Sequence, residues 1–202
     1  VTQVLTDEMT KTPIKKDFSD LTWQQVDKHT TYVVVTGWSQ WAKTLYQWLA
    51  AALKKNPDTS KDIVFFIVGG ILNNDVAQYF EDLENCISLP FLDQSDMSTL
   101  YYFSDIAMTR GGSTSLAEQK LHNMLLCIVP LPRTHDQKKN AEHYVASYGD
   151  ILVLQNDQLS SSLDKAFSVL SGHKKAHPRH DQLKDQLSKT KKIITDEIIS
   201  LE

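Results

Sequence analysis

The chain has 202 residues, of which 41% are hydrophobic and 23% charged, and its formal net charge is −4 at pH 7. These values are typical of a soluble globular domain and argue against general nucleic-acid binding, which needs a basic surface. No run approaches the ~18 consecutive apolar residues of a membrane-spanning helix, and no signal peptide opens the chain. Cys86 and Cys127 lie in apolar runs without zinc-ligand spacing, which predicts buried free thiols.

The two ends of the chain differ in character from its middle. Residues 1–29 are polar and irregular, dominated by Thr, Lys and Asp, which is typical of a linker that enters a folded domain. The chain begins at Val1 instead of Met, and Leu201-Glu202 resembles the remnant of an affinity tag. We therefore expect residues 30–200 to form one domain, excised from a longer protein, with 201–202 as the tag remnant.

Apolar runs and helical periods alternate along the chain, which is the order typical of a parallel α/β sheet. Strands are predicted at residues 31–36, 62–70, 86–92, 106–109, 124–129 and 151–154. Helices are predicted at residues 41–53, 74–83, 97–103, 114–121, 141–148 and 159–170, with a long amphipathic helix over 183–201. The expected fold is α/β, a Rossmann-like parallel sheet of about six strands flanked by helices, with ligands beyond the carboxyl ends of the strands.

The functional prediction depends on residues 105–150. There Arg110-Gly111-Gly112 follows a short apolar run, and Ser113 and Thr114 offer N-cap hydroxyls to the next helix. Glycine lets backbone N–H groups approach a ligand, and a helix start adds donors and partial positive charge, which favours a phosphate. Glu118 lies four residues after Thr114, on the same helix face and ~6 Å further along, where a carboxylate can accept hydrogen bonds from a ribose diol. Alone, Gly-Gly-Ser-Thr is more typical of a plain turn with an N-cap.

Three runs here resemble the nucleotide-sugar half of GT-B glycosyltransferases, above all the MurG family of cell-wall N-acetylglucosaminyltransferases. They are residues 109–118 (TRGGSTSLAE), 125–132 (LLCIVPLP) and 135–141 (HDQKKNA). The likeness is specific from Phe91 to Ala141 and extends more loosely over nearly the whole chain. It implies that the domain is the C-terminal half of a GT-B fold and binds a UDP-sugar without a metal or other cofactor.

By this resemblance, the residues that contact or shape the nucleotide-sugar site are Ser39, Phe91, Leu92, Gly111, Gly112, Ser113, Thr114, Glu118, Asp136, Gln137 and Asn140. The backbone of Phe91 and Leu92 would meet the uracil, and Glu118 the ribose. The stretch from Gly111 to Thr114 would hold phosphate, with Ser39 opposite. Without the resemblance, Phe91 and Leu92 would be ordinary core residues.

The second polar loop is assigned to the sugar by the same resemblance. Asp136 and Gln137 match a pair that contacts sugar hydroxyls, and Asn140 matches an asparagine that steadies the loop. From the residues alone, Asp136 is equally typical of a helix N-cap. No catalytic residue is named, because in the family the general base and the lipid-acceptor site belong to the other domain.

Three positions depart from the family pattern. Leu5 stands where relatives carry an arginine, and Trp38 and Trp41 stand where they carry glycine in a loop that helps to hold the diphosphate. The bulky side chains would narrow that loop, unless both tryptophans pack into the core or between domains. Three histidines between residues 172 and 180 do not predict a metal site, because Pro178 interrupts any shared helix face.

The resemblance predicts transfer of N-acetylglucosamine from UDP-N-acetylglucosamine to a lipid-linked acceptor in cell-wall synthesis. The acceptor would be held by a missing N-terminal domain or a partner chain, so the 202 residues alone would be inactive. The expected location is cytoplasmic, with peripheral association with the membrane face left open and no nucleic-acid partner. Two alternatives stay open: a non-catalytic or diverged nucleotide-sugar-binding subunit that needs a separate acceptor-binding partner, and a sugar-nucleotide 2-epimerase.

Overall fold

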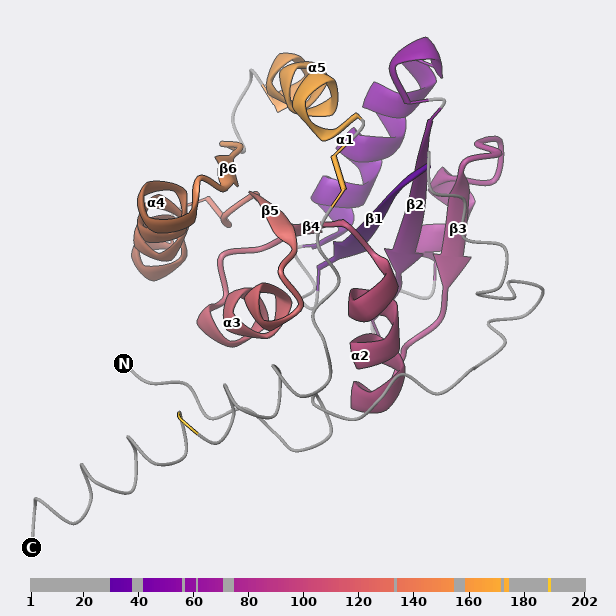
Figure 1. The fold of residues 1–202 in the computed structure, drawn as a ribbon. Helices are drawn as coiled ribbons and strands as arrows, with labels where there is room; N and C mark the ends of the chain where they lie inside the picture. The colour runs from indigo at the N-terminus through magenta and orange to yellow at the C-terminus, as the bar shows by residue number, and fades with distance from the viewer. Residues whose placement is uncertain are drawn as a thin grey trace, which may run out of the picture.

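The computed structural model describes residues 30–37, 42–55, 57–60, 62–70, 75–132, 134–154, 159–171, 173–174 and 189. Six strands form one parallel sheet in the order β3-β2-β1-β4-β5-β6 (Figure 1). The strands are β1 (Thr31–Thr36), β2 (Ile63–Val68), β3 (Cys86–Leu89), β4 (Ile106–Thr109), β5 (Leu125–Ile128) and β6 (Ile151–Leu152). The expected fold class is confirmed.

The described helices alternate with these strands. The α-helices are α1 (Ala42–Lys55), α2 (Gln94–Phe103), α3 (Ser113–Leu121), α4 (His135–Tyr148) and α5 (Leu159–Leu170), and the short 3-10 helices are η3 (Pro57–Ser60) and η4 (Val76–Tyr79). None of these described helices combines the length and apolar character that crossing a bilayer requires.

β1 lies at the centre of the sheet because its side chains are apolar or β-branched throughout. All six of its residues are buried, and Val33 is paired with Phe65 of β2 on one side and Ile106 of β4 on the other. A strand that is covered by helices on both faces has no polar side, so its sequence is a continuous apolar run. The step from β1 to β4 is also where the strand order reverses, which places the ligand crevice of such sheets beyond these two strands.

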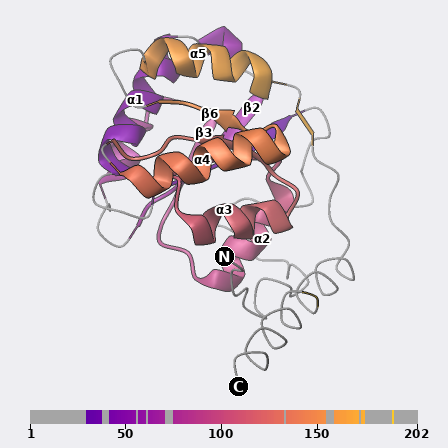
Figure 2. The same ribbon diagram turned by 90° about the vertical axis from the view of Figure 1, so that its left-hand side faces the viewer.

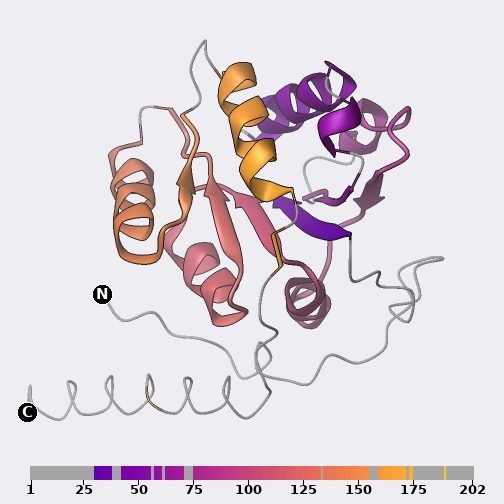
Figure 3. The same cartoon turned by 45° about the horizontal axis from the view of Figure 1, so that its top comes forward.

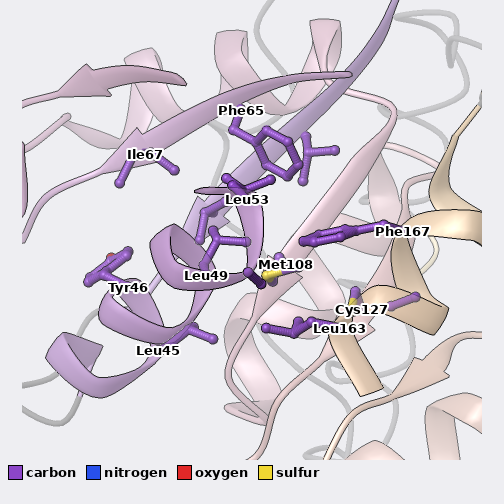
Figure 4. Packing of buried hydrophobic residues seen from close by; sticks show 14 of the residues in the cluster. Leu45, Tyr46, Leu49, Leu53, Phe65, Ile67, Met108, Cys127, Leu163 and Phe167 are labelled. Carbon is purple, nitrogen blue, oxygen red and sulfur yellow. The ribbon is translucent and has the colours of Figure 1, made fainter. Parts of the chain in front are cut away.

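Helices cover both faces of the sheet (Figures 2 and 3). On one face, Leu49 of α1 and Phe167 of α5 pack with Phe65 and Met108 from the strands (Figure 4). On the other face, Leu100 of α2, Leu116 of α3 and Ala141 of α4 form a second core over the same strands. Burying both faces fixes the sheet, so the loops at its carboxyl edge stand on a rigid base.

Three local expectations are corrected. The helix expected over residues 74–83 is a 3-10 turn at η4 followed by further tight turns, in which the Phe80, Leu83 and Cys86 N–H groups each donate to the carbonyl three residues earlier. A 3-10 turn advances more per residue than an α-helix, which suits the short crossing from β2 to β3. The helix predicted from residue 141 begins earlier, at His135, and α2 begins at Gln94 after the Asp93 cap. The amphipathic helix at 183–201 lies outside the described residues apart from residue 189.

Both cysteines are free thiols, as predicted. Cys127 is fully buried in β5, and Cys86 is half-buried at the start of β3. Burial raises the pKa of each thiol to about 12, because the thiolate would lose its hydration. Neither sulfur is therefore a thiolate at neutral pH, and both serve the packing of the sheet.

Candidate functional site

Two polar loops meet at the carboxyl edge of the sheet, beyond β4 and β5. Gly111 lies in the loop after β4, and Gln137 and Asn140 lie in the first turns of α4 after β5. The Gly111 N–H donates to Gln137 Oε1 at 3.3 Å, and the Leu131 N–H donates to the same oxygen at 3.1 Å. Asn140 Nδ2 donates to the Gly111 carbonyl at 3.0 Å. We call this set of three hydrogen bonds the loop clasp.

The loop clasp brings together three residues that the resemblance assigned to the site, and it engages two groups that were expected to face the ligand. Asn140 was expected to steady the second polar loop, and its hydrogen bond ties α4 to the Gly111 loop. Gln137 was expected to contact sugar, yet its side-chain oxygen is engaged by two backbone N–H groups. The Gly111 N–H, expected to face a phosphate, already has this partner.

Gly111 and Gly112 have different structural reasons to be glycine. A Cβ on Gly111 would lie 2.4 Å from the Gln137 carbonyl oxygen and 2.9 Å from its carbonyl carbon, so the loop and α4 approach too closely for any side chain. Gly112 has φ −70° and no neighbour within 4 Å of an added Cβ. Only the first glycine is therefore required by packing, and the second leaves open space in front of α3.

The N-terminus of α3 carries the donors that remain for an anion. Its N-cap is Gly112 rather than Ser113 or Thr114, and no side chain caps the helix. The Gly112 carbonyl accepts from the Leu116 N–H, so α3 is regular from its first turn. Ser113 and Thr114 are exposed at the helix start. Uncapped N–H groups at the positive end of a helix dipole are suited to bind phosphate.

Arg110, which directly precedes the two glycines, is a buried positive charge at the end of β4. Arg110 is only 7% exposed, and its Nη1 donates to the Val129 carbonyl at 3.1 Å, which ties the end of β4 to the end of β5. Burial lowers the pKa of Arg110 to about 10, since the guanidinium loses hydration. The group is still protonated at neutral pH, so it contributes positive charge at the carboxyl edge of the sheet.

Glu118 lies on α3, one turn after the helix start to which the phosphate was assigned. It lies in the middle of α3, is half-buried, and forms no hydrogen bond or ion pair with the described residues. Burial raises the pKa of its carboxyl group above the ordinary value. A half-buried carboxylate without a partner among the described residues is costly, which favours a ligand that donates hydrogen bonds to it.

The raised pKa of Glu118 gives an expected pH dependence. Uridine affinity should fall as the pH is lowered through this pKa, at a higher pH than for an ordinary glutamate, because the protonated carboxyl loses acceptor capacity. Affinity for 2′,3′-dideoxyuridine should not change over this range, and neither nucleoside has a phosphate that titrates. Equal pH profiles for the two nucleosides in a titration followed by NMR would exclude a Glu118–diol contact.

The raised pKa of Glu118 also makes the folding stability depend on pH, in the opposite direction to uridine binding. The folded state binds the Glu118 proton more tightly than the unfolded chain, so the contribution of this residue to stability is full at low pH. It is lost as the pH rises from the unfolded pKa through the raised folded pKa. Glu118→Gln should therefore raise the unfolding temperature above this pH window while weakening uridine binding.

Phe91 and Leu92 follow β3, at the same edge of the sheet as the loop clasp. Phe91 is 47% exposed, whereas Leu92 is buried in the core beside α2. A pocket of about 340 Å³ opens beside Phe91, lined by the ends of β2 and β3 and by η4. β3 and β4 are three strand spacings apart, about 14 Å, so a ligand that reached both Phe91 and Gly112 would have the length of a nucleotide rather than of a phosphate.

Asp136 and Ser39 complete the predicted set. Asp136 is exposed in the first turn of α4, and the N-cap of that helix is Thr134, so the N-cap interpretation of Asp136 is wrong. The Asp136 carboxylate is thus exposed to solvent, next to Gln137 in the same helix turn. Ser39 lies outside the described residues, as do Leu5, Trp38 and Trp41.

Sequence reasoning missed a buried polar residue beside Glu118. Gln119 is 0% exposed and hydrogen-bonds to Thr109 and Tyr101. The signal was present in the sequence, because Gln119 lies three residues after the buried Leu116 and so on the same helix face. A polar side chain on an apolar face indicates a buried hydrogen-bond network.

The model of the glycosyltransferase family 28 C-terminal domain matches residues 32–196. The chain belongs to this family. The match covers β2 to β6 and all of β1 except Thr31, and it places both polar loops, Glu118 and Asn140 inside the family 28 domain. None of the described residues gathers into a group of three or more His, Cys, Asp or Glu side chains suited to a metal ion.

Relatives of this family 28 domain include UDP-N-acetylglucosamine–N-acetylmuramyl-(pentapeptide) pyrophosphoryl-undecaprenol N-acetylglucosamine transferases. The protein from Bdellovibrio bacteriovorus is 28% identical over 148 residues, 72% of this chain and 41% of the relative. That from Flavobacterium psychrophilum is 33% identical over 133 residues, 61% of this chain and 35% of the relative. The crystal structure of Acinetobacter baumannii MurG superposes with a TM-score of 0.60 at 21% identity, over 84% of this chain and 46% of that one. The chain thus spans less than half the length of these relatives.

Proposed function

We propose that this domain binds a UDP-sugar for a glycosyltransferase that transfers N-acetylglucosamine to a lipid-linked acceptor. The observation that carries the proposal is the arrangement on α3. The helix starts after Gly112 without a side-chain cap, with open space at that glycine, and Glu118 further along is a half-buried carboxylate without a partner among the described residues. Phosphate donors and a diol acceptor at this spacing match a nucleoside diphosphate. The family membership and the names of the relatives support the choice of sugar and acceptor.

The described residues are placed to stabilise the charge on the diphosphate leaving group. In the transfer, the acceptor hydroxyl oxygen bonds to the anomeric carbon of the sugar, and the bond from that carbon to the diphosphate breaks. The diphosphate takes the electron pair, so negative charge builds in front of the α3 N–H groups, at the edge of the sheet where β4 ends in Arg110. Fixed donors that face developing charge stabilise a transition state without reorganising.

The remaining parts of the reaction are assigned outside this chain. We assign the base that takes the acceptor proton, and the acceptor-binding surface, to the portion of the relatives that the chain does not span. Around the sugar, Asp136 offers carboxylate acceptors and Gln137 offers its side-chain NH₂ group, because the Gln137 oxygen is held in the loop clasp. Phe91 and its pocket are assigned to the base, since 340 Å³ falls within the usual range of small-molecule sites.

The chain of 202 residues should bind UDP and transfer no sugar. We expect a dissociation constant on the order of 0.1–1 mM, about −4 to −5.5 kcal/mol, because only one side of the cleft is present. UDP should bind more tightly than uridine, and purine nucleoside diphosphates should bind more weakly than UDP. Calorimetry with these nucleotides, and a transfer assay with UDP-N-acetylglucosamine and a lipid-linked acceptor, test both parts.

Different failures point to different alternatives. Equal affinity for ADP and UDP would contradict the uridine assignment but leave a diphosphate site. Sugar transfer by this chain alone would overturn the division of labour. The absence of binding by every nucleotide would favour the diverged, non-catalytic subunit.

A further inference from the structure

A buried chain of polar side chains runs beneath the candidate site. Gln119 Nε2 donates to Thr109 Oγ1 and to the Tyr101 hydroxyl, each at 3.3 Å. Thr36 Oγ1 donates to Thr109 Oγ1 at 3.2 Å. Thr36 and Thr109 are the last residues of β1 and β4, the two strands between which the strand order reverses. The hydrogen-bonded side chains therefore connect these two strands to α2 through Tyr101 and to α3 through Gln119.

A glutamine at position 119 lowers the stability of the fold. Its side chain is 0% exposed, and its Oε1 is buried with no partner among the described residues. An unsatisfied buried carbonyl lowers stability, whereas a leucine of similar length would avoid that cost beside the buried Leu116. Packing alone therefore does not account for a glutamine here, and residues that break packing rules at a functional site commonly serve that site.

The hydrogen bonds of Gln119 constrain the rotation of α3 about its axis. Hydrogen bonds are directional, and a side chain tip lies about 5–6 Å from the helix axis, so a rotation of about 10° moves it by about 1 Å. The C-terminal end of α3 is held separately, because Lys120 Nζ lies 2.6 Å from the buried carboxylate of Asp150 and 3.0 Å from the Met124 carbonyl. Gln119 adds a hydrogen bond from α3 to Thr109, which holds the helix at the end of β4.

We propose that Gln119 is a positioning residue, whose buried hydrogen bonds to Thr109 and Tyr101 fix the rotation of α3 so that Glu118 meets the ribose diol. Glu118 is the preceding residue of the same helix, so it moves with any rotation that Gln119 prevents. The proposal rests on the proposed nucleotide-sugar function, and it deepens it by naming what makes Glu118 selective for a ribose.

The test is a double-mutant cycle on the 202-residue chain with UDP and 2′,3′-dideoxy-UDP as ligands. NMR titration, which reaches millimolar dissociation constants, compares the unmutated chain with Gln119→Leu, Glu118→Ala and the double variant. We expect Gln119→Leu to weaken UDP about fivefold to tenfold, the scale of one hydrogen bond. In the Glu118→Ala background, and with 2′,3′-dideoxy-UDP, the same change should alter affinity by less than about twofold, because contacts that act as a unit are not additive.

Stability separates a positioning role from a structural one. Gln119→Leu should keep or raise the thermal unfolding midpoint while it weakens UDP, and Thr109→Val, which removes the acceptor by another route, should weaken UDP in the same Glu118-dependent way. Unchanged UDP binding in Gln119→Leu, or an equal loss with and without Glu118, would overturn the positioning role while leaving the nucleotide site in place. Failure of the unmutated chain to bind UDP would overturn both the nucleotide site and this role.

Discussion

Gly111→Ala should destabilise the domain by about 2–4 kcal/mol and abolish measurable UDP binding. The new Cβ would lie 2.4 Å from the Gln137 carbonyl oxygen, a backbone atom at the start of α4 that cannot rotate away. The loop and the helix must therefore separate, which stretches the Gln137 and Asn140 hydrogen bonds of the loop clasp. Each of these bonds contributes about 1 kcal/mol, and the displaced backbone adds strain. Thermal and urea unfolding measure the first effect, and calorimetry with UDP measures the second.

Gly112→Ala is the matched control for this substitution. Its φ of −70° suits alanine, and no atom lies within 4 Å of the new Cβ, so the cost to stability should be no more than about 1 kcal/mol from the weaker N-cap. The methyl group would occupy the space in front of α3, however, and should weaken UDP more than uridine. A stable Gly112→Ala variant with unchanged UDP affinity would place the diphosphate elsewhere. Equal stability losses for both alanine variants would contradict the close approach at Gly111.

The parts of the fold that depend on local pattern were predictable from the sequence. β1 and α5 have the predicted bounds, because a β-branched run and a helical period each bury one continuous set of apolar side chains. The parallel sheet of six strands followed from the alternation of strands and helices, whereas the order of the strands across the sheet was not predicted. The helix expected over residues 74–83 was wrong because η4 is fixed by tertiary packing, with Val76 and Phe80 buried against the sheet, rather than by its own period.

Only those parts of the candidate site whose residues all lie on one helix or loop were predictable from the sequence. Gly112 and Glu118 belong to a single helix start, so their spacing already indicated their relation. The loop clasp could not be read from the chain, because Gly111 and Gln137 are 26 residues apart and meet only when β4 and β5 pair. For the same reason the resemblance gave Gln137 a sugar contact and left its hold on the Gly111 loop unseen.

Gln137→Leu should show what this residue does in the absence of any sugar. The Gly111 and Leu131 N–H groups would both lose their acceptor, and we expect a loss of stability of about 1–3 kcal/mol. Of the loop clasp, only the Asn140 hydrogen bond would then remain, so the affinity for UDP should fall along with that for UDP-N-acetylglucosamine. If Gln137 served only as a sugar contact, UDP affinity would be unchanged and only the sugar nucleotide would bind more weakly.

Two further variants separate the roles of the loop clasp and the cleft. Gln137→Glu keeps an oxygen acceptor for both N–H groups, so its unfolding temperature without nucleotide should return close to that of the unmutated chain. Asp136→Ala removes an exposed carboxylate of the same helix turn and should leave stability and UDP binding unchanged while weakening UDP-N-acetylglucosamine. Calorimetry with UDP and the sugar nucleotide on the three variants gives the comparison. A loss confined to the sugar nucleotide in Gln137→Leu, with normal stability, would return Gln137 to the sugar-binding role and leave Asn140 as the residue that holds the Gly111 loop.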